Sequence, residues 1–300
     1  MAGRVTILMA TLNGAAFLPA QLESLSAQTH RDWRLWVSDD GSTDGTLGVL
    51  HDFARARPDR DVRILQGPMR GSAANFLSAL CHPDLPPGPV ALCDQDDIWL
   101  RGKLARALRR MAAAPPEVPV LYAAESWRCD ATLAARRASR APRIAPDFGN
   151  ALVQNLCAGH TTVLNGPALA LVRRAGPLSA IAFHDWWFYQ LVTGAGGLCL
   201  LDPRPVALYR QHGGNTFGAA GGIAAWHRRV WLLLGGRFRG WVTAHARALA
   251  GTGLLAPEAQ RMAEALLRGP VGRAATIRRL RRDTRAGTAA LHLAALIGRV

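Results

Sequence analysis

The sequence is nearly free of lysine and contains neither a long apolar run nor closely spaced cysteines. Lys103 is the only lysine, so almost all of the positive charge is guanidinium. No segment approaches the about 20 apolar residues that a membrane span needs, and the N-terminal run is too short for a signal peptide. The five cysteines show no close-spaced pair, which excludes the usual zinc and Cys-X-X-Cys redox motifs. We therefore expect a protein of a reducing cytosol, soluble or peripheral on a membrane.

Positive charge is present in excess and is unevenly placed. The 300 residues contain 36 Lys plus Arg against 21 Asp plus Glu, and 49% of them are hydrophobic, enough for a sizeable core. From Trp226 to Val300 there are 14 arginines against three acids. Such a face could meet nucleic acid, an anionic membrane surface or an acidic substrate, and composition alone does not choose among them.

Four apolar segments are each followed by a polar turn and a helix-like pattern. These segments are "RVTILMAT" at residues 4–11, "WRLWV" through Val37, "DVRILQ" and "GPVALCD". Strands that alternate with helices predict an α/β fold with a parallel, Rossmann-like, doubly wound sheet. The segment "LCAGHTTVLN" also resembles a strand, and from Ala224 onward the pattern is helical and basic.

Polar residues stand where three of these strands end. They are Thr11 and Asn13, Asp39 and Asp40, and Asp94 and Asp96. In parallel sheets, ligands bind beyond the carboxyl ends of the strands. The sequence therefore predicts one binding site built from three strand termini.

The stretch "DQDD" at residues 94–97 places three acids within four positions. Two carboxylates about 4 Å apart repel by roughly 4 kcal/mol at an effective dielectric near 20, so a positive group is expected among them. A hard cation such as Mg²⁺ is the first candidate, bound by Asp94 and Asp96 on one side of an extended backbone. The alternative is an exposed acidic turn, and Asp97 is expected to begin the next helix.

The stretch "SDDGSTDGT" at residues 38–46 has two interpretations. Ser42, Thr43 or Asp44 can cap the following helix. Asp39 and Asp40 precede that cap at a strand end, where their carboxylates could accept hydrogen bonds from a base or a ribose hydroxyl.

Two later motifs add further polar residues. Asp185 in "HDWW" is either a helix N-cap or a general base, and Trp186 and Trp187 belong either to the core or to a sugar-stacking surface. Arg210 and His212 precede a glycine pair in "YRQHGGN". That loop could close over a diphosphate, with His212 completing a metal shell, although a lone histidine is more often structural.

In this order, these motifs resemble the family 2 glycosyltransferases, which are inverting enzymes with the GT-A fold. The resemblance covers residues 4–217 through "VTILMATLNG", "SDDGSTDGT", "CDQDDIWLRGKL", "HDWW" and "YRQHGGN". The amino-acid sequences of these motifs are most similar to those of the rhamnosyltransferase branch, whose members use dTDP-L-rhamnose. Leu12 departs from the family pattern, because an aromatic residue often stands at this position.

The resemblance implies a role for each candidate residue. Asp185 would deprotonate the acceptor hydroxyl, and Asp96 with His212 would bind Mg²⁺ or Mn²⁺. The nucleotide-sugar would contact Thr11, Asn13, Asp39, Asp40, Asn75, Asp94 and Arg210. The acceptor side would contain His184, Trp186 and Trp187.

The resemblance also implies a domain plan and partners. Residues 1–223 would form the GT-A domain, with a nucleotide-sugar half at 1–105 and an acceptor half at 106–223, and residues 224–300 a basic helical appendage. The expected reaction moves L-rhamnose onto a glycan or lipid-linked acceptor of a bacterial surface polysaccharide, at the cytoplasmic face of the inner membrane. A UDP-sugar donor (galactose or N-acetylglucosamine) and a non-enzymatic basic binding protein are the alternatives. We expect no nucleic-acid partner, because acids at the strand ends oppose phosphate backbones.

Overall fold

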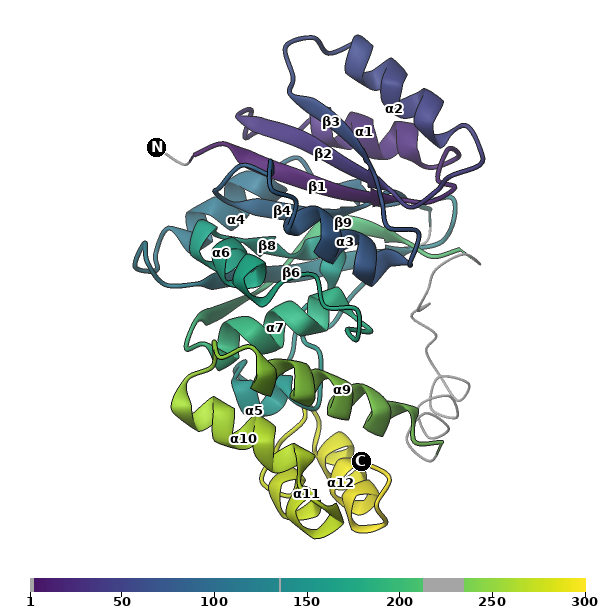
Figure 1. The fold of residues 1–300 in the computed structure, drawn as a ribbon. Helices are drawn as coiled ribbons and strands as arrows, with labels where there is room; N and C mark the ends of the chain where they lie inside the picture. The colour runs from purple at the N-terminus through teal and green to yellow at the C-terminus, as the bar shows by residue number, and fades with distance from the viewer. Residues whose placement is uncertain (1–2, 135, 213–234) are drawn as a thin grey trace.

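In the computed structural model, residues 3–134, 136–212 and 235–300 are described. They form one central sheet with helices on its two faces, and a group of helices from the C-terminal part of the chain gathers at one end (Figure 1). The boundary expected between residues 223 and 224 lies outside the described residues.

The first part of the sheet is parallel, as the sequence predicts. Its elements are β1 (Val5–Thr11), α1 (Leu18–Ser26), β2 (Trp33–Asp39), α2 (Thr46–Arg55), β3 (Val62–Gln66), α3 (Ser72–Leu80) and β4 (Val90–Asp94). The strands lie in the order β3-β2-β1-β4, and each neighbouring pair is parallel. Parallel neighbours need a crossover connection, which the helices provide.

The second part of the sheet is mixed. Its elements are β5 (Ile98–Trp99), α4 (Lys103–Met111), β6 (Val120–Cys129), β7 (Arg136–Ala138), α5 (Phe148–Ala151), η1 (Gly159–Thr161), β8 (Val163–Leu164), α6 (Gly166–Ala175), α7 (His184–Gly194) and β9 (Leu198–Arg210). The order continues β4-β8-β6-β9-β5, with β8 antiparallel to both of its neighbours. The expected mostly parallel sheet is confirmed, and β5, β7 and β8 are its antiparallel exceptions.

The segment "LCAGHTTVLN" is a strand only at Val163 and Leu164, which corrects the expectation of a continuous strand. Residues Gly159–Thr161 form a 3-10 turn instead. The hydroxyls of Thr161 and Thr162 both donate to the carbonyl of Ala158, at 3.0 Å each. Such local bonds compete with the ladder of a sheet and favour a turn.

Residues of the central strands face two apolar layers. Leu8 and Trp36 belong to the layer that contains α3 and α7, whereas Ile7 and Val37 belong to the layer against α1 and α4. Successive side chains of a strand point to opposite faces, so a strand buried on both sides reads as a continuous apolar run. This arrangement explains the apolar segments that mark the strands in the sequence.

The described residues beyond 235 are helical, as expected. They form α9 (Arg237–Gly251), α10 (Pro257–Leu267), α11 (Pro270–Ile277) and α12 (Arg285–Leu296). These helices share the apolar core of α5 and α7, and His245 Nδ1 of α9 lies 2.8 Å from Gln190 Oε1 of α7. Among the described residues, each helix is too short or too polar to span a bilayer.

Candidate active site

The ends of the three predicted strands meet at one edge of the sheet. Thr11 pairs in register with Asp39, and Ala10 pairs with Asp94. Since β1 lies between β2 and β4, the polar residues that end these strands are neighbours in space. The structure thus brings together the strand termini that the sequence indicated.

The carboxylate of Asp39 is saturated by hydrogen bonds from the protein itself. Its Oδ2 accepts from the hydroxyls of Thr11 (2.7 Å) and Ser42 (2.6 Å), and its Oδ1 accepts from the amides of Ser42 (2.7 Å) and Gly41 (3.2 Å). Burial by itself raises the pKa of Asp39, but the hydrogen bonds, led by Ser42, lower it overall. Asp39 is therefore a charged residue that fixes the turn after β2.

Asp40 and Asn75 fasten the loop between β3 and α3 to β2. Asp40 is 8% exposed and accepts from the amides of Met69 and Gly71, each at 2.7 Å. Asn75 is buried, donates to the carbonyl of Ser38 at 2.8 Å and accepts from the Ser38 hydroxyl. A carboxylate has about four acceptor positions, so Asp40 retains lone pairs for a ligand, whereas the Asn75 amide is committed to Ser38.

The loop after β1 is held by Asn13 and by a residue that sequence reasoning did not place in the site. Asn13 adopts φ 49°, and its side-chain oxygen accepts from the amide of Thr43 at 2.8 Å. The Gln95 side chain bonds both the amide and the carbonyl of Leu12 at 2.9 Å. A Cβ on Gly14 would lie 2.1 Å from Gln95 Oε1, so this close approach requires glycine.

The two predicted metal ligands are in contact. Asp96 Oδ2 lies 2.7 Å from His212 Nε2, and the two side chains are 15% and 19% exposed. The His212 ring stacks on Phe17, with the ring centroids 4.5 Å apart. A carboxylate and an imidazole nitrogen, both still reachable from solvent, therefore stand together beyond β4.

Asp97 does not begin a helix, contrary to expectation. It precedes the short strand β5, and α4 starts only at Lys103. Asp97 is fully buried, its Oδ1 accepts from the amide of Arg210 at 3.3 Å, and its Oδ2 has no hydrogen-bond partner among the described residues. Burial, followed by the charges of Asp94 and Asp96, raises its pKa well above the usual value.

The positive group expected among the acids is Lys103. This residue is fully buried, and its ammonium donates to the carbonyl of His160 and lies 3.5 Å from the centroid of the Trp99 ring. Burial lowers its pKa to about 7, against the opposing effect of Cys93, Asp97 and Asp94. Sequence reasoning missed this role. The signal in the sequence was a single lysine in a chain otherwise rich in arginine, because a compact ammonium fits a site that a guanidinium fork does not.

A second group of possible metal donors lies beside this lysine. The donor atoms of Asp94, Asp97 and His160 all lie within 4.8 Å of one another. Burial, followed by the charge of Lys103, lowers the pKa of His160 to about 3, and its Nε2 has no partner among the described residues. The nearby ammonium of Lys103 repels a cation at this group. Asp96 and His212 are therefore the better-suited metal ligands.

Asp185, from a distant part of the chain, acts electrostatically on the same acids. Burial, followed by the charges of Asp96 and Asp185, raises the pKa of Asp94 to about 7. Asp185 lies in the first turn of α7, where Oδ1 accepts from the amide of Trp186 at 2.8 Å and Oδ2 from the amide of Gly159 at 3.2 Å. The N-cap of α7 is Phe183, so Asp185 is oriented by backbone amides without being the cap residue.

Residues 6–148 match the model of the family described as glycosyl transferase family 2. This part of the chain is therefore similar to a family 2 glycosyltransferase domain. The dTDP-rhamnosyl transferase RfbG of Shigella flexneri is 28% identical to this chain over 253 residues, which cover 81% of this chain and 84% of RfbG.

Solved structures that share the fold of this chain include two complexes with nucleotides. The mannosyltransferase PcManGT from Pyrobaculum calidifontis, in complex with GDP-Man and Mn²⁺, gives a TM-score of 0.56 at 20% identity and covers 100% of this chain and 87% of that one. TarS 1–349 from S. aureus, in complex with UDP, gives 0.61 at 12% identity and covers 99% and 87%. The expected GT-A fold is thereby confirmed.

Trp186 and Trp187 belong to the core of the protein, which decides between their two interpretations. They are 4% and 0% exposed, and the Trp186 indole donates to the carbonyl of Ala151 at 2.6 Å. A buried ring cannot stack on a sugar, so placing these two residues on the acceptor side is corrected. His184 packs its ring against Phe76 with centroids 4.2 Å apart, and burial lowers its pKa.

Arg210 supports the acidic loop after β4. It is 8% exposed, and its guanidinium donates to the carbonyls of Asp96 (3.0 Å from Nε) and Ala131. It also lies over the ring of Phe17, 5.1 Å from the centroid. The glycine pair expected to close over a diphosphate, Gly213 and Gly214, lies outside the described residues.

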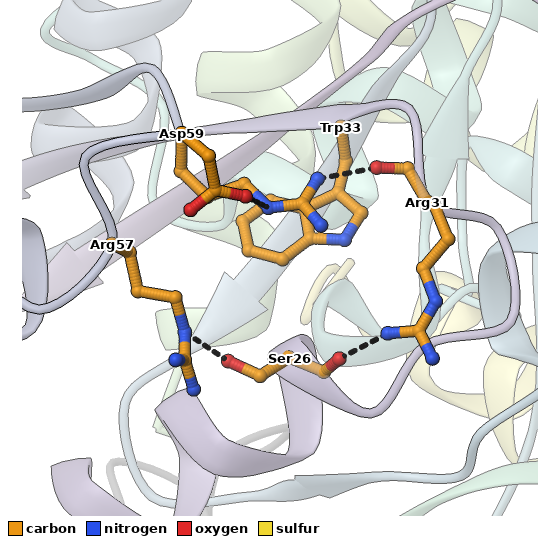
Figure 2. A pocket seen from close by; sticks show the side chains of 6 residues that line it. Ser26, Arg31, Trp33, Arg57 and Asp59 are labelled. Carbon is orange, nitrogen blue, oxygen red and sulfur yellow. Dashed lines mark hydrogen bonds and ion pairs between the residues drawn. The ribbon is translucent and has the colours of Figure 1, made fainter.

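Two hollows in the described part of the chain differ in their position relative to the site. One of about 320 Å³ reaches His160 and Tyr209 and is lined by β6 and residues 154–160, so it adjoins the acids. The other, of about 290 Å³, is shown in Figure 2 and is lined by Ser26, Arg31, Trp33, Arg57, Asp59 and Arg60. Arg31 and Arg57 both bond Ser26 there. Because Trp33 begins β2, this second hollow lies at the end of the strand opposite the candidate site.

Proposed function

We propose that the protein transfers L-rhamnose from dTDP-L-rhamnose, with inversion, onto a hydroxyl of a glycan or lipid-linked acceptor in bacterial surface polysaccharide synthesis. The observation that carries this proposal is the sheet edge where the strand ends at Asp39 and Asp94 lie side by side, with Asp96 in contact with His212 and with Asp94 under the charge of Asp185. The relative from Shigella flexneri, whose name states dTDP-rhamnosyl transfer, supports the choice of donor.

The nucleoside would lie over the turn after β2. Asp40 retains acceptor positions for a base N–H or a ribose hydroxyl, with Asn13 and the exposed Leu12 at the neighbouring loop. Thr11, Asp39 and Asn75 would support this turn from within the protein, because their polar groups are already hydrogen-bonded there. Asp94 would lie on the ribose side of the diphosphate.

The residues present fit a divalent cation. Asp96 and His212 supply an oxygen and a nitrogen donor in contact, and both side chains remain partly exposed. Mg²⁺ and Mn²⁺ accept such ligands and retain positions for phosphate oxygens. When bound, the cation would supply Lewis acidity to the departing nucleoside diphosphate. Arg210 and Lys103 would hold the acidic loop in place from the protein side.

Asp185 would act as the general base. Its two bonds to the amides of Gly159 and Trp186 fix the orientation of the carboxylate and leave lone pairs on both oxygens. Asp185 would take the proton of the acceptor hydroxyl, whose oxygen attacks the anomeric carbon of the sugar. A positioned general base contributes about 10²–10⁴ in rate. The hollow that adjoins His160 is the proposed entrance for the acceptor, with His184 nearby.

We further propose that the protein works at the cytoplasmic face of the inner membrane in peripheral contact with anionic lipid, where a lipid-linked acceptor would be found. The 14 arginines from Trp226 onward support this location.

The test is a comparison of Asp185→Asn, Asp96→Asn and the control Asp52→Asn, an exposed acid on α2. Nucleoside diphosphate release would be measured with dTDP-L-rhamnose, UDP-galactose and UDP-N-acetylglucosamine, each with Mn²⁺. We expect turnover with dTDP-L-rhamnose, a loss of about 10²–10⁴ in kcat for Asp185→Asn, and no change for Asp52→Asn.

Binding measurements separate the two active-site roles. Calorimetry with dTDP and Mn²⁺ should show normal affinity for Asp185→Asn and weakened, metal-dependent binding for Asp96→Asn. Normal turnover of Asp185→Asn would overturn its assignment as the base. Faster release of nucleoside diphosphate from a UDP-sugar than from dTDP-L-rhamnose would identify the UDP-sugar as the donor. The proposed chemistry would be unchanged.

A further inference from the structure

Helix α12 has an apolar face on its exposed side as well as on its buried side. The buried side contains Leu291, Ala294 and Ala295. The exposed positions between Ala286 and Ile297 are all apolar, and they are Ala286, Ala289, Ala290, Leu293, Leu296 and Ile297. We call these six residues the α12 stripe. Leu293, Leu296 and Ile297 are 62%, 56% and 56% exposed.

The spacing of the α12 stripe is that of one helix face. Its members follow the pattern i, i+3, i+4, i+7, i+10 and i+11, which places them along one side of an α-helix. A helix at the surface of a protein normally presents charged or polar side chains at these positions. A contiguous apolar stripe on the exposed side therefore indicates a surface that is covered in use.

The exposed charges in the segment that contains the α12 stripe are all positive. Beyond residue 265, the exposed ionisable side chains are Arg268, Arg278, Arg279, Arg281, Arg285 and Arg299. Asp283 is the only acidic side chain in this part of the sequence, and its carboxylate accepts from the amide of Arg143. The segment that forms the stripe therefore carries a net positive charge.

We propose that the α12 stripe is a membrane-docking surface, which inserts Leu293, Leu296 and Ile297 at the interface of an anionic phospholipid leaflet while the neighbouring arginines bind lipid phosphates. An amphipathic helix with an apolar face and basic flanks binds a membrane in this way, in the plane of the interface. Figure 1 shows α12 at the end of the molecule away from β3 and α2, where a flat surface can approach it.

Charge complementarity decides between lipid and a second copy of this chain. In a homodimer built on the α12 stripe, the arginines that flank one copy would face those of the other, and like charges oppose such a contact. An anionic leaflet satisfies the apolar face and the arginines together. The inference extends the membrane contact proposed above and rests on it, but its test needs no sugar transfer.

The experiment is co-sedimentation of the full chain with vesicles of phosphatidylcholine alone or with about one third phosphatidylglycerol. We expect binding to the anionic vesicles only, weakened by salt. Leu293→Gln/Leu296→Gln should bind about tenfold more weakly, since Gln retains helix propensity and removes apolar area. The matched control is Leu47→Gln/Leu198→Gln, two leucines that are 38% and 41% exposed elsewhere, which should bind like the unmodified protein.

The contribution of charge is tested by Arg278→Gln/Arg279→Gln against Arg109→Gln/Arg110→Gln, an exposed pair at the end of α4. Each basic residue near the surface contributes about fivefold in affinity, so the first pair should bind more than tenfold more weakly and the second should not. Thermal unfolding would verify that all variants fold.

Two results would overturn the inference. The first is no binding to anionic vesicles, or binding that is equal for the stripe and control variants. The second is a dimer by sedimentation that becomes monomeric in Leu293→Gln/Leu296→Gln with vesicle binding unchanged, which would assign the α12 stripe to a second copy. Transfer activity in solution could persist in either case, so failure here is distinguishable from failure of the proposed reaction.

Discussion

Two buried carboxylates at the same sheet edge have opposite surroundings. Asp39 accepts four hydrogen bonds, and they lower its pKa despite burial. Asp97 accepts one long bond from Arg210, leaves Oδ2 without a partner among the described residues, and has a raised pKa. A saturated carboxylate stabilises a turn, whereas an unsaturated one costs stability, which proteins tolerate mainly at functional sites.

The difference also concerns the source of the compensating groups. Around Asp39 the donors are Gly41 and Ser42, the next residues of the chain, and Thr11 at the end of β1. Around Asp97 the compensation comes from the charge of Lys103 and from the amide of Arg210. Three of the four bonds to Asp39 are thus local, whereas the acidic cluster depends on packing between distant segments.

The largest expected effect on this comparison follows from Lys103→Met. Removing the buried amine leaves the carbonyl of His160 without its donor and Asp94 and Asp97 without their positive neighbour, and each buried polar group left unsatisfied costs about 1–3 kcal/mol. Urea unfolding would measure the loss, with the exposed Arg110→Met expected within about 0.5 kcal/mol of the unmodified protein. Adding Asp97→Asn to Lys103→Met should recover part of the loss. An unfolding midpoint unchanged by Lys103→Met would show that the lysine does not compensate the acids.

The comparison is tested directly by Asp39→Asn and Asp97→Asn. In Asp39→Asn an amide replaces an acceptor that faces four donors, and we expect a loss of about 2–3 kcal/mol in the free energy of unfolding. In Asp97→Asn a neutral side chain replaces an acid whose charged form is disfavoured, so the change should be within about 1 kcal/mol. Both would be measured by urea unfolding at pH 7. Equal losses in the two variants would remove the distinction between them.

A buried histidine outside the site extends the comparison to the pH dependence of the free energy of unfolding. His245 is bonded through both ring nitrogens, to Gln190 and to the amide of Ala182, and burial lowers its pKa to about 4. Below its unfolded value near 6.5, the unfolded chain binds a proton that the folded chain does not. Stability should therefore fall as pH decreases from about 6.5 towards 4, by about 2 kcal/mol at pH 5, and be unaffected above 6.5.

The measurement is the change in unfolding free energy between pH 7 and pH 5 in the unmodified protein and in His245→Gln. The variant should lose less stability over this interval, because it lacks the titrating ring. His51→Gln, at an exposed position of α2, should retain the full decrease. A decrease of the same size in all three proteins would mean that His245 does not bind a proton on unfolding.

The sequence was a good guide where the contacts are local. The strands that end at Thr11, Asp39 and Asp94 were predictable, because strands buried on both faces are continuously apolar and polar turns follow them. The contact of Asp96 with His212 was indicated by the order of motifs and is present. Asp97 was placed wrongly because its nearest neighbours in sequence resemble a helix start, and its burial is imposed by β9 and Lys103.

Two tryptophans and two cysteines show the same limit of prediction from local sequence. Trp186 and Trp187 could be core or surface on pattern alone, and only the packing of α7 against α5 and α9 buries them. Cys157 and Cys199 are far apart in the chain and show no motif, yet their sulfur atoms lie 3.4 Å apart. No spacing rule in the sequence predicts either arrangement, because both depend on contacts between distant elements.

By itself, the sequence determined the alternation of strands and helices, the edge of the sheet that carries the site, and the basic character of the region after Trp226. These properties follow from periodicity and composition, which are local. Only the tertiary structure decided that Lys103 is the charge among the acids, that the charge of Asp185 acts on Asp94, and that α12 carries an exposed apolar stripe. Burial and electrostatic interaction depend on distances between residues that the chain brings together only when it folds.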